Sequence, residues 1–121
     1  MKICVTSQGD NLDAQVDPRF GRCPYFIIID TDIPGFEAIQ NPNVSGMGGV
    51  GVQSGQLMSE KQVKSVLTGN VGPNAFRTLQ AAGINIITGI SGSVKDVIEK
   101  YRSGELKPAD DSNVDSKFGM G

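Results

Sequence analysis

Two arginines and a cysteine lie within five residues of one another, and their side chains are suited to holding an anionic ligand. They are Arg19, Arg22 and Cys23, in a polar stretch rich in Gly and Asp. Guanidinium groups donate charge-assisted hydrogen bonds to anions, and their charges favour the thiolate form of a nearby cysteine. A thiolate in turn ligates soft metals. This spacing predicts a site for a metal-containing anion. In the alternative interpretation, Arg19 pairs with Asp17 or with a carboxylate of the sheet, and Cys23 is a small buried residue.

A turn between a predicted strand and a predicted helix is the second candidate. It consists of Gly69, Asn70, Val71, Gly72, Pro73 and Asn74. Proline suits the first position of a helix, and the N–H groups and dipole at a helix start attract anions. Gly72 would let the backbone approach a ligand closely. The alternative is a tight turn that binds nothing. No Gly-Lys-Ser/Thr follows, so the turn is not a phosphate-binding Walker motif.

A glycine-rich segment, residues 45–51, precedes another predicted helix and contains Met47 and Gly48. The Met47 thioether is soft and polarisable, so one interpretation is a cover over a ligand. The other interpretation is a surface loop. Glycine spacings of this kind are too common to indicate a dinucleotide site.

The remaining cysteine and the acidic residues of the first loop are assigned structural roles. Cys4 lies in the middle of an apolar run, so it is predicted to be a core residue. The loop also contains Asp10, Asp13 and Asp17. Carboxylates are ligands for hard cations, but a solvated loop explains this cluster more simply.

The composition excludes several classes of function. The 121 residues include no histidine, which excludes His-based catalysis and His metal sites. Residues 1–103 carry nine basic and nine acidic side chains, so the net charge of −2 comes from the end of the chain and no basic surface for nucleic acid is expected. No run approaches the ~20 apolar residues of a membrane span. With two cysteines and no leader-like segment, we expect a cytoplasmic protein with reduced thiols.

Apolar periodicity predicts five strands and three helices. The strands are expected at residues 3–7, 24–30, 36–40, 63–68 and 84–88. The short turn between the second and third strands indicates an antiparallel pair. Helices are expected after the glycine-rich segment, from Pro73 and after Ser93. This order predicts an α/β domain over residues 1–106, with helices on a mixed five-stranded sheet, followed by a flexible acidic tail over residues 107–121.

The last two helices have predicted apolar faces. In the first of them, Phe76, Leu79 and Ala82 share a face, and Gly83 ends the helix. In the second, the face consists of Val94, Val97, Ile98 and Tyr101. Their spacing is that of an amphipathic helix. Ser93 and Asp96 resemble a capping box at its start.

Three segments together resemble one known family. They are MKICVTS at 1–7, VDPRFGRCPYF at 16–26 and TGNVGPNAF at 68–76, and the resemblance covers about residues 1–106. This is similar to the dinitrogenase iron–molybdenum cofactor biosynthesis family, which includes NifX- and NifY-like proteins, the C-terminal part of NifB and stand-alone members such as the orange-protein branch. The absence of histidine favours the stand-alone branch.

The resemblance implies a fold and a function. The implied fold is a ribonuclease-H-like three-layer arrangement with strand order 3-2-1-4-5 and an antiparallel second strand. The implied function is non-enzymatic: binding, carriage or scaffolding of an anionic metal–sulfur cluster that contains molybdenum with iron or copper. An alternative is an adaptor that docks on an ATPase or cluster-assembly partner and binds no metal itself. A nuclease is not expected, because the first and fourth predicted strands contain no acidic residue to hold catalytic metals.

The expected site lies where the loops after the first and fourth strands converge at one edge of the sheet. Its candidate residues are Arg19, Arg22, Cys23, Met47, Gly48, Gly69, Asn70, Val71, Gly72 and Asn74. Cys23 is the candidate metal ligand among them. Whether it ligates the metal, or the cluster is held by charge and backbone N–H groups alone, is left open by the sequence.

Overall fold

The computed structural model describes residues 1–42 and 50–106. Two predictions fall outside these ranges: the cover containing Met47 and Gly48, and the tail at residues 107–121. In the described residues, the elements follow the predicted order of three strands and then alternating helices and strands.

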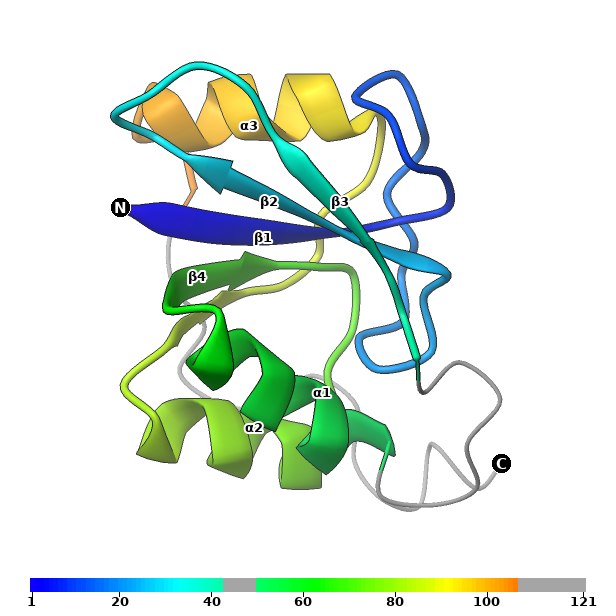
Figure 1. The fold of residues 1–121 in the computed structure, drawn as a ribbon, viewed down its shortest axis with the longest axis vertical. Helices are drawn as coiled ribbons and strands as arrows, with labels where there is room; N and C mark the ends of the chain where they lie inside the picture. Colours follow the sequence, from blue (N-terminus) through cyan, green and yellow to red (C-terminus); the bar gives the residue numbers. More distant parts are fainter. Residues whose placement is uncertain (43–49, 107–121) are drawn as a thin grey trace.

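The five strands form one mixed sheet (Figure 1). They are β1 (Lys2–Ser7), β2 (Tyr25–Asp30), β3 (Glu37–Gln40), β4 (Val63–Leu67) and β5 (Asn85–Ile87). Their order across the sheet is β3-β2-β1-β4-β5. β2 runs antiparallel to both β1 and β3, whereas β4 runs parallel to β1 and β5. The predicted strand order and the antiparallel second strand are therefore confirmed, and the predicted strand boundaries agree with the observed ones to within one residue.

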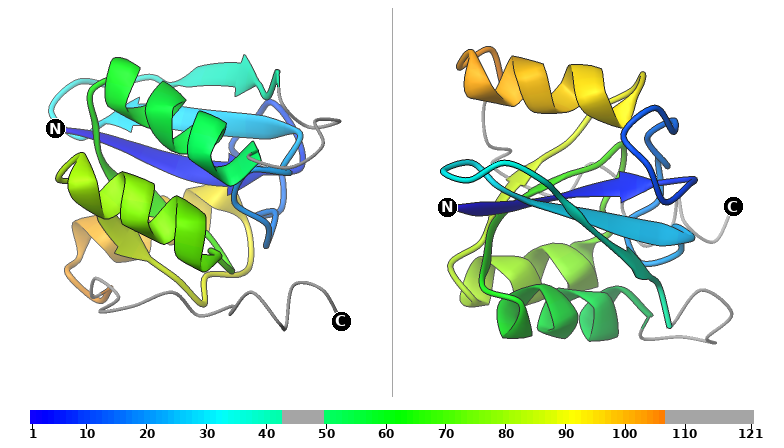
Figure 2. Two further views of the ribbon diagram at one scale, coloured as in Figure 1. Left: turned by 90° about the horizontal axis from the view of Figure 1, so that it is seen from below. Right: turned by 45° about the horizontal axis from the view of Figure 1, so that its top comes forward.

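Three helices cover the two faces of the sheet (Figure 2). They are α1 (Val50–Glu60), α2 (Pro73–Ala81) and α3 (Val94–Arg102). Among the described residues, α1 and α2 pack side by side on one face, and α3 covers the other. No helix in the described part of the chain combines the length and apolarity that a membrane crossing requires.

Each face of the sheet has its own apolar core, because alternate strand residues point to opposite faces. On the side of α1 and α2, Cys4, Phe26 and Val66 pack with Met58 of α1 and Leu79 of α2. The opposite core is built by strand and helix residues that include Ile3, Val5, Ile27, Leu67, Val94 and Val97. Cys4 has no exposed surface, so its predicted core role is confirmed.

The two predicted helix faces are confirmed except at one residue. Phe76 and Leu79 of α2 are buried. Ala82 is exposed, and the prediction was wrong because Ala82 is the residue at which α2 ends rather than part of its packed face. α3 buries Val94, Val97 and Ile98. Its start is capped by the Ser93 hydroxyl, which accepts a hydrogen bond from the Asp96 N–H at 3.2 Å.

A close contact between α1 and α2 explains why α1 has a glycine, Gly55, in its middle. A Cβ built on Gly55 would lie 2.8 Å from Cγ2 of Thr78, so the absence of a side chain lets α1 approach α2. Elsewhere in a helix, a change from Gly to Ala stabilises by roughly 1 kcal/mol. Here the added methyl has no room, and overpacking costs typically about 1–3 kcal/mol.

Gly55→Ala is therefore expected to destabilise the protein by about 1 kcal/mol, as measured by urea unfolding. In a Thr78→Ser background the obstructing methyl is gone, while the hydroxyl that donates to the Asn74 carbonyl is kept. In that background the closest remaining contact of the new methyl is Cβ of residue 78, at 3.3 Å, so Gly55→Ala should cost clearly less than in the wild-type background. An equal loss in both backgrounds would contradict the contact with the Thr78 methyl as the cause.

Candidate functional site

The loop between β1 and β2, residues 8–24, folds back across one edge of the sheet. In Figure 1 this loop lies at the end where β1 and β4 terminate. The N–H of Asp17 donates to the carbonyl of Thr6 at 2.9 Å, and the N–H of Val16 donates to the carbonyl of Gly92 at 2.8 Å. These bonds tie the loop both to β1 and to the segment before α3. The loop is thus held in place on both sides, as a rigid binding edge requires.

Side chains of this loop alternate between the core and the solvent. Phe20 and Cys23 are buried, and the Phe20 ring packs at a tilt against Phe26 with 6.0 Å between the centroids. Arg19 and Arg22 are exposed. The two buried side chains anchor the loop and leave the two guanidinium groups on its outer side.

The loop joins the turn after β4, as the sequence predicted. The N–H of Asn70 donates to the carbonyl of Pro18 at 2.7 Å, and the N–H of Phe20 donates to the carbonyl of Asn70 at 3.2 Å. Arg19 and Asn70 thereby form an isolated parallel bridge. A Cβ on Gly69 would lie 2.7 Å from Cα of Pro18, so only glycine permits this approach.

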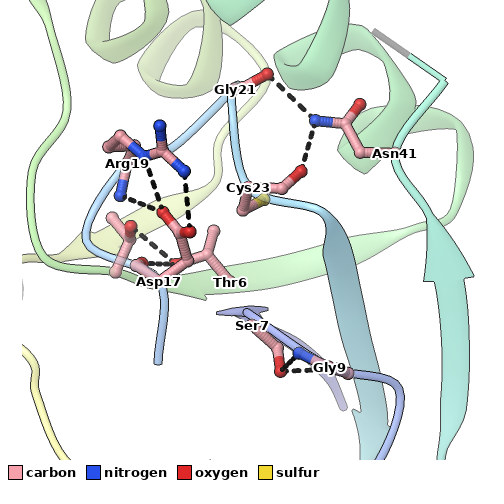
Figure 3. A network of polar contacts seen from close by, with 9 residues as sticks. Thr6, Ser7, Gly9, Asp17, Arg19, Gly21, Cys23 and Asn41 are labelled. Carbon is pink, nitrogen blue, oxygen red and sulfur yellow. Dashed lines mark hydrogen bonds and ion pairs between the residues drawn. The ribbon is translucent and has the colours of Figure 1, made fainter. Parts of the chain in front are cut away.

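Arg19 is paired with Asp17, as one of the two interpretations of the sequence expected (Figure 3). Its Nε and Nη2 atoms donate to the two carboxylate oxygens at 3.2 and 3.0 Å, and its backbone N–H donates to Oδ1 at 2.8 Å. The Asp17 side chain is 2% exposed and that of Arg19 is 59% exposed. Burial of Asp17 corrects the assignment of all three loop aspartates to solvent. Of the three aspartates, Asp10 and Asp13 are exposed.

Two buried threonines, Thr6 and Thr68, form hydrogen bonds beside the Arg19–Asp17 pair. The Thr6 hydroxyl donates to the Asp17 carbonyl at 2.7 Å and lies 2.8 Å from the Thr68 hydroxyl. Neither threonine has any exposed surface. The bonds connect the ends of β1 and β4 to the loop, and sequence reasoning missed them because threonine at a strand end is also an ordinary sheet residue.

Cys23 has a raised pKa, not the lowered one expected from two neighbouring arginines. Burial raises the pKa of the thiol to about 12, and the Asp17 carboxylate acts in the same direction. The backbone N–H groups of Cys23, Gly21 and Ser7 lower it but are outweighed. The expected direction was wrong because Asp17 offsets the charge of Arg19 and the thiol is fully buried.

Asn41 is a second residue that sequence reasoning missed. Its side-chain Nδ2 donates to the carbonyls of Gly21 and Cys23, at 2.9 Å each (Figure 3). Asn41 is 2% exposed and follows directly after β3. It therefore fixes the second half of the loop to the edge strand. The signal in the sequence was an asparagine next to a predicted strand end, which is too common to identify such a contact.

The start of α2 lies next to the bridged loops and has no capping side chain. Gly72 is the N-cap residue, and a Cβ built on it would meet no atom within 4 Å. The first turn contains no acidic residue. The exposed Asn74 accepts a hydrogen bond from Nη2 of Arg77, which brings a further cation to this helix start. A positive charge is unfavourable beside the positive end of a helix dipole, so an anion would be stabilised there.

Side-chain ligands for a bare metal ion are not gathered at this edge. In residues 1–42 and 50–106, no group of three or more Cys, Asp and Glu side chains could hold an ion together. The site instead gathers exposed guanidinium groups and a helix start. Such donors suit an anion, since these groups hydrogen-bond to anions rather than coordinate metals.

The described residues form a small α/β domain in which the loops after β1 and β4 meet at one edge of the sheet. The chain belongs to the dinitrogenase iron-molybdenum cofactor family, whose sequence profile matches residues 1–104. The family works in the biosynthesis and binding of the iron–molybdenum cofactor and is associated with metal–sulfur clusters.

Solved structures and a protein sequence support this membership. The apo form of the orange protein from Desulfovibrio gigas superposes with a TM-score of 0.89 and 34% identity, over 93% of this chain and 95% of that one. A NifB-like protein from Thermotoga gives a TM-score of 0.78 at 34% identity, over 88% and 91% of the two chains. An uncharacterised protein of Methanocaldococcus jannaschii is 30% identical over 110 residues, 88% of this chain and 90% of its own length.

Proposed function

We propose that this protein carries or scaffolds an anionic metal–sulfur cluster, without catalysing a reaction. The cluster would rest on the surface formed by the loop at Arg19 and Arg22 and by the turn from Gly69 to Asn74. The observation that supports this most is the Arg19–Asn70 bridge, because it joins the backbone of an exposed arginine to the turn that leads into α2, whose N-cap residue offers no side-chain cap. We also infer that the three-layer architecture is a ribonuclease-H-like one, which the strand order supports.

The chemistry of these donors supports an anionic cargo, and membership of the family supports its metal content. Guanidinium and backbone N–H groups hold an anion by charge and direction, and they distinguish poorly between metals inside it. Membership of the cofactor family supports molybdenum with iron in the cluster. Copper in place of iron is the alternative. Met47 and Gly48 stay candidates for a cover over it.

Binding of tetrathiomolybdate, a simple soluble molybdenum sulfide dianion, tests the proposal. Anaerobic protein should retain molybdenum through gel filtration, as measured by elemental analysis and by a shifted absorption spectrum. Arg22→Ala should weaken binding roughly thirtyfold or more, since lost charged hydrogen-bond partners cost about 2 kcal/mol or more. Arg102→Ala removes an equally exposed arginine from α3 and serves as the matched control, with unchanged binding expected.

A wild-type protein that retains no molybdenum under these conditions would contradict the carrier function. The adaptor, which binds partner proteins and no metal, would then be the better interpretation. Equal losses in Arg22→Ala and Arg102→Ala would show instead that binding depends on overall charge and not on this surface.

Cys23→Ser distinguishes two modes of holding the cluster. If Cys23 ligates the metal, serine should abolish loading, because a neutral hydroxyl is a poor ligand for soft metals. If charge and N–H groups hold the cluster, serine should load nearly as well as wild type. The complete burial of the thiol and its raised pKa favour the second mode. Retained molybdenum in a folded Cys23→Ser variant is therefore the expected result.

A further inference from the structure

Asp17 is a negative charge built into a surface that otherwise attracts anions. Its carboxylate is almost completely buried and faces the guanidinium of Arg19 through two hydrogen bonds, with a third from the Arg19 backbone N–H. In the described part of the chain, this is the ion pair closest to the bridge between Arg19 and Asn70. A site evolved only for tight anion binding would not place a carboxylate there, because like charges repel.

The same contacts fix the orientation of Arg19. A guanidinium has five N–H donors, and Asp17 engages one from Nε and one from Nη2. The other donors lie on the edge that faces away from the carboxylate. Because the Arg19 side chain is 59% exposed, that edge is accessible to a ligand. Asp17 thus orients the donors of Arg19 and at the same time offsets their charge.

We propose that Asp17 limits the affinity of this surface for anions, so that a bound anion is oriented by Arg19 and yet can be released. This inference rests on the proposed carrier function and specifies how the same site is regulated. A carrier must give up its cargo, and an Arg19 guanidinium without a neighbouring carboxylate would hold a dianion more tightly. The buried carboxylate reduces that attraction without removing any donor that faces the ligand.

Asp17→Asn tests the proposal, because asparagine has nearly the same shape and can still accept from Arg19. The probe is tetrathiomolybdate, with its dissociation constant measured at low and high salt. Asp17→Asn should bind roughly tenfold more tightly at low salt, since one unit of repulsion is lost, and the gain should shrink as salt screens it. Asp13→Asn removes an exposed charge from the same loop and is the matched control, with little change expected.

A second comparison covers the case in which Asp17→Asn does not fold. Arg19→Gln leaves the Asp17 charge uncompensated, so it should bind tetrathiomolybdate more weakly than Arg22→Gln. Asp17→Asn/Arg19→Gln removes both charges of the pair and should regain most of that difference. No regain in a double variant that is folded by circular dichroism would overturn the proposal.

The outcomes separate this proposal from the carrier function. If wild type binds tetrathiomolybdate and Asp17→Asn binds it no more tightly, the limiting role of Asp17 is overturned and the carrier function stays intact. If Asp17→Asn binds tetrathiomolybdate and wild type does not, the limiting role is supported and the carrier function is contradicted. Binding by neither overturns both.

Discussion

Arg19→Ala is expected to lower the free energy of unfolding by about 2–3 kcal/mol, although Arg19 is itself largely exposed. The loss arises at Asp17, whose buried carboxylate would keep only the hydrogen bond from the backbone N–H of residue 19. Removing one partner of a buried ion pair costs about 3–5 kcal/mol. We expect a smaller loss here, because water can occupy the place of the exposed guanidinium. Guanidinium chloride unfolding of the two proteins measures the difference.

Two further variants identify the cause of this loss. Arg102→Ala removes an exposed arginine from α3 and should change stability by less than about 0.5 kcal/mol. Asp17→Asn/Arg19→Ala leaves no buried charge and should recover much of the lost stability. An Arg19→Ala variant as stable as Arg102→Ala would mean that Asp17 does not need its partner.

Gly69→Ala is expected to destabilise the protein by about 2–3 kcal/mol and to separate the two loops of the site. Its Cβ would lie 2.7 Å from Cα and 3.0 Å from the carbonyl oxygen of Pro18, and backbone atoms cannot rotate out of the way. The hydrogen bond from the Asn70 N–H to Pro18 should weaken first. Urea unfolding and faster hydrogen exchange at the Asn70 amide measure the two effects.

Gly72→Ala is the matched control, because a Cβ at this position meets no atom within 4 Å. It should cost no more than about 1 kcal/mol, through the weaker capping preference of alanine. Similar losses at the two glycines would contradict the close approach of the loops. If Gly72→Ala keeps its stability but loses tetrathiomolybdate binding, the open space at the start of α2 is where the anion rests.

Much of the fold could be predicted because its elements carry strong local signals. The runs at β1, β2 and β4 are rich in β-branched residues, and Pro73 and Ser93 mark helix starts at which α2 and α3 do begin. The error at Ala82 arose at a helix end, where the periodic pattern continues past the last packed turn.

The site was predicted as two segments, but the contacts within it were not. That residues 19–23 and 69–74 meet follows from strand order, which places the ends of β1 and β4 at one edge. Which glycine permits a close approach depends on a neighbour distant in sequence: Gly69 faces Pro18, whereas Gly72, the residue singled out by sequence, faces open space. The depth at which Asp17 is buried is likewise invisible in a loop of polar residues.

The chain connectivity determines when this surface can form during synthesis. Thr6 and Thr68 are 62 residues apart, and β1 reaches β4 only after two further strands and a helix have been made. Contacts between residues so far apart form late, because closing the intervening chain costs entropy before the contact is gained. A nascent chain that ends at Pro42 already contains all of β2 and β3 and both arginines, but nothing for Arg19 to bridge to. Synthesis of β4 and of the turn that follows it is therefore the step at which Arg19 gains its bridge partner.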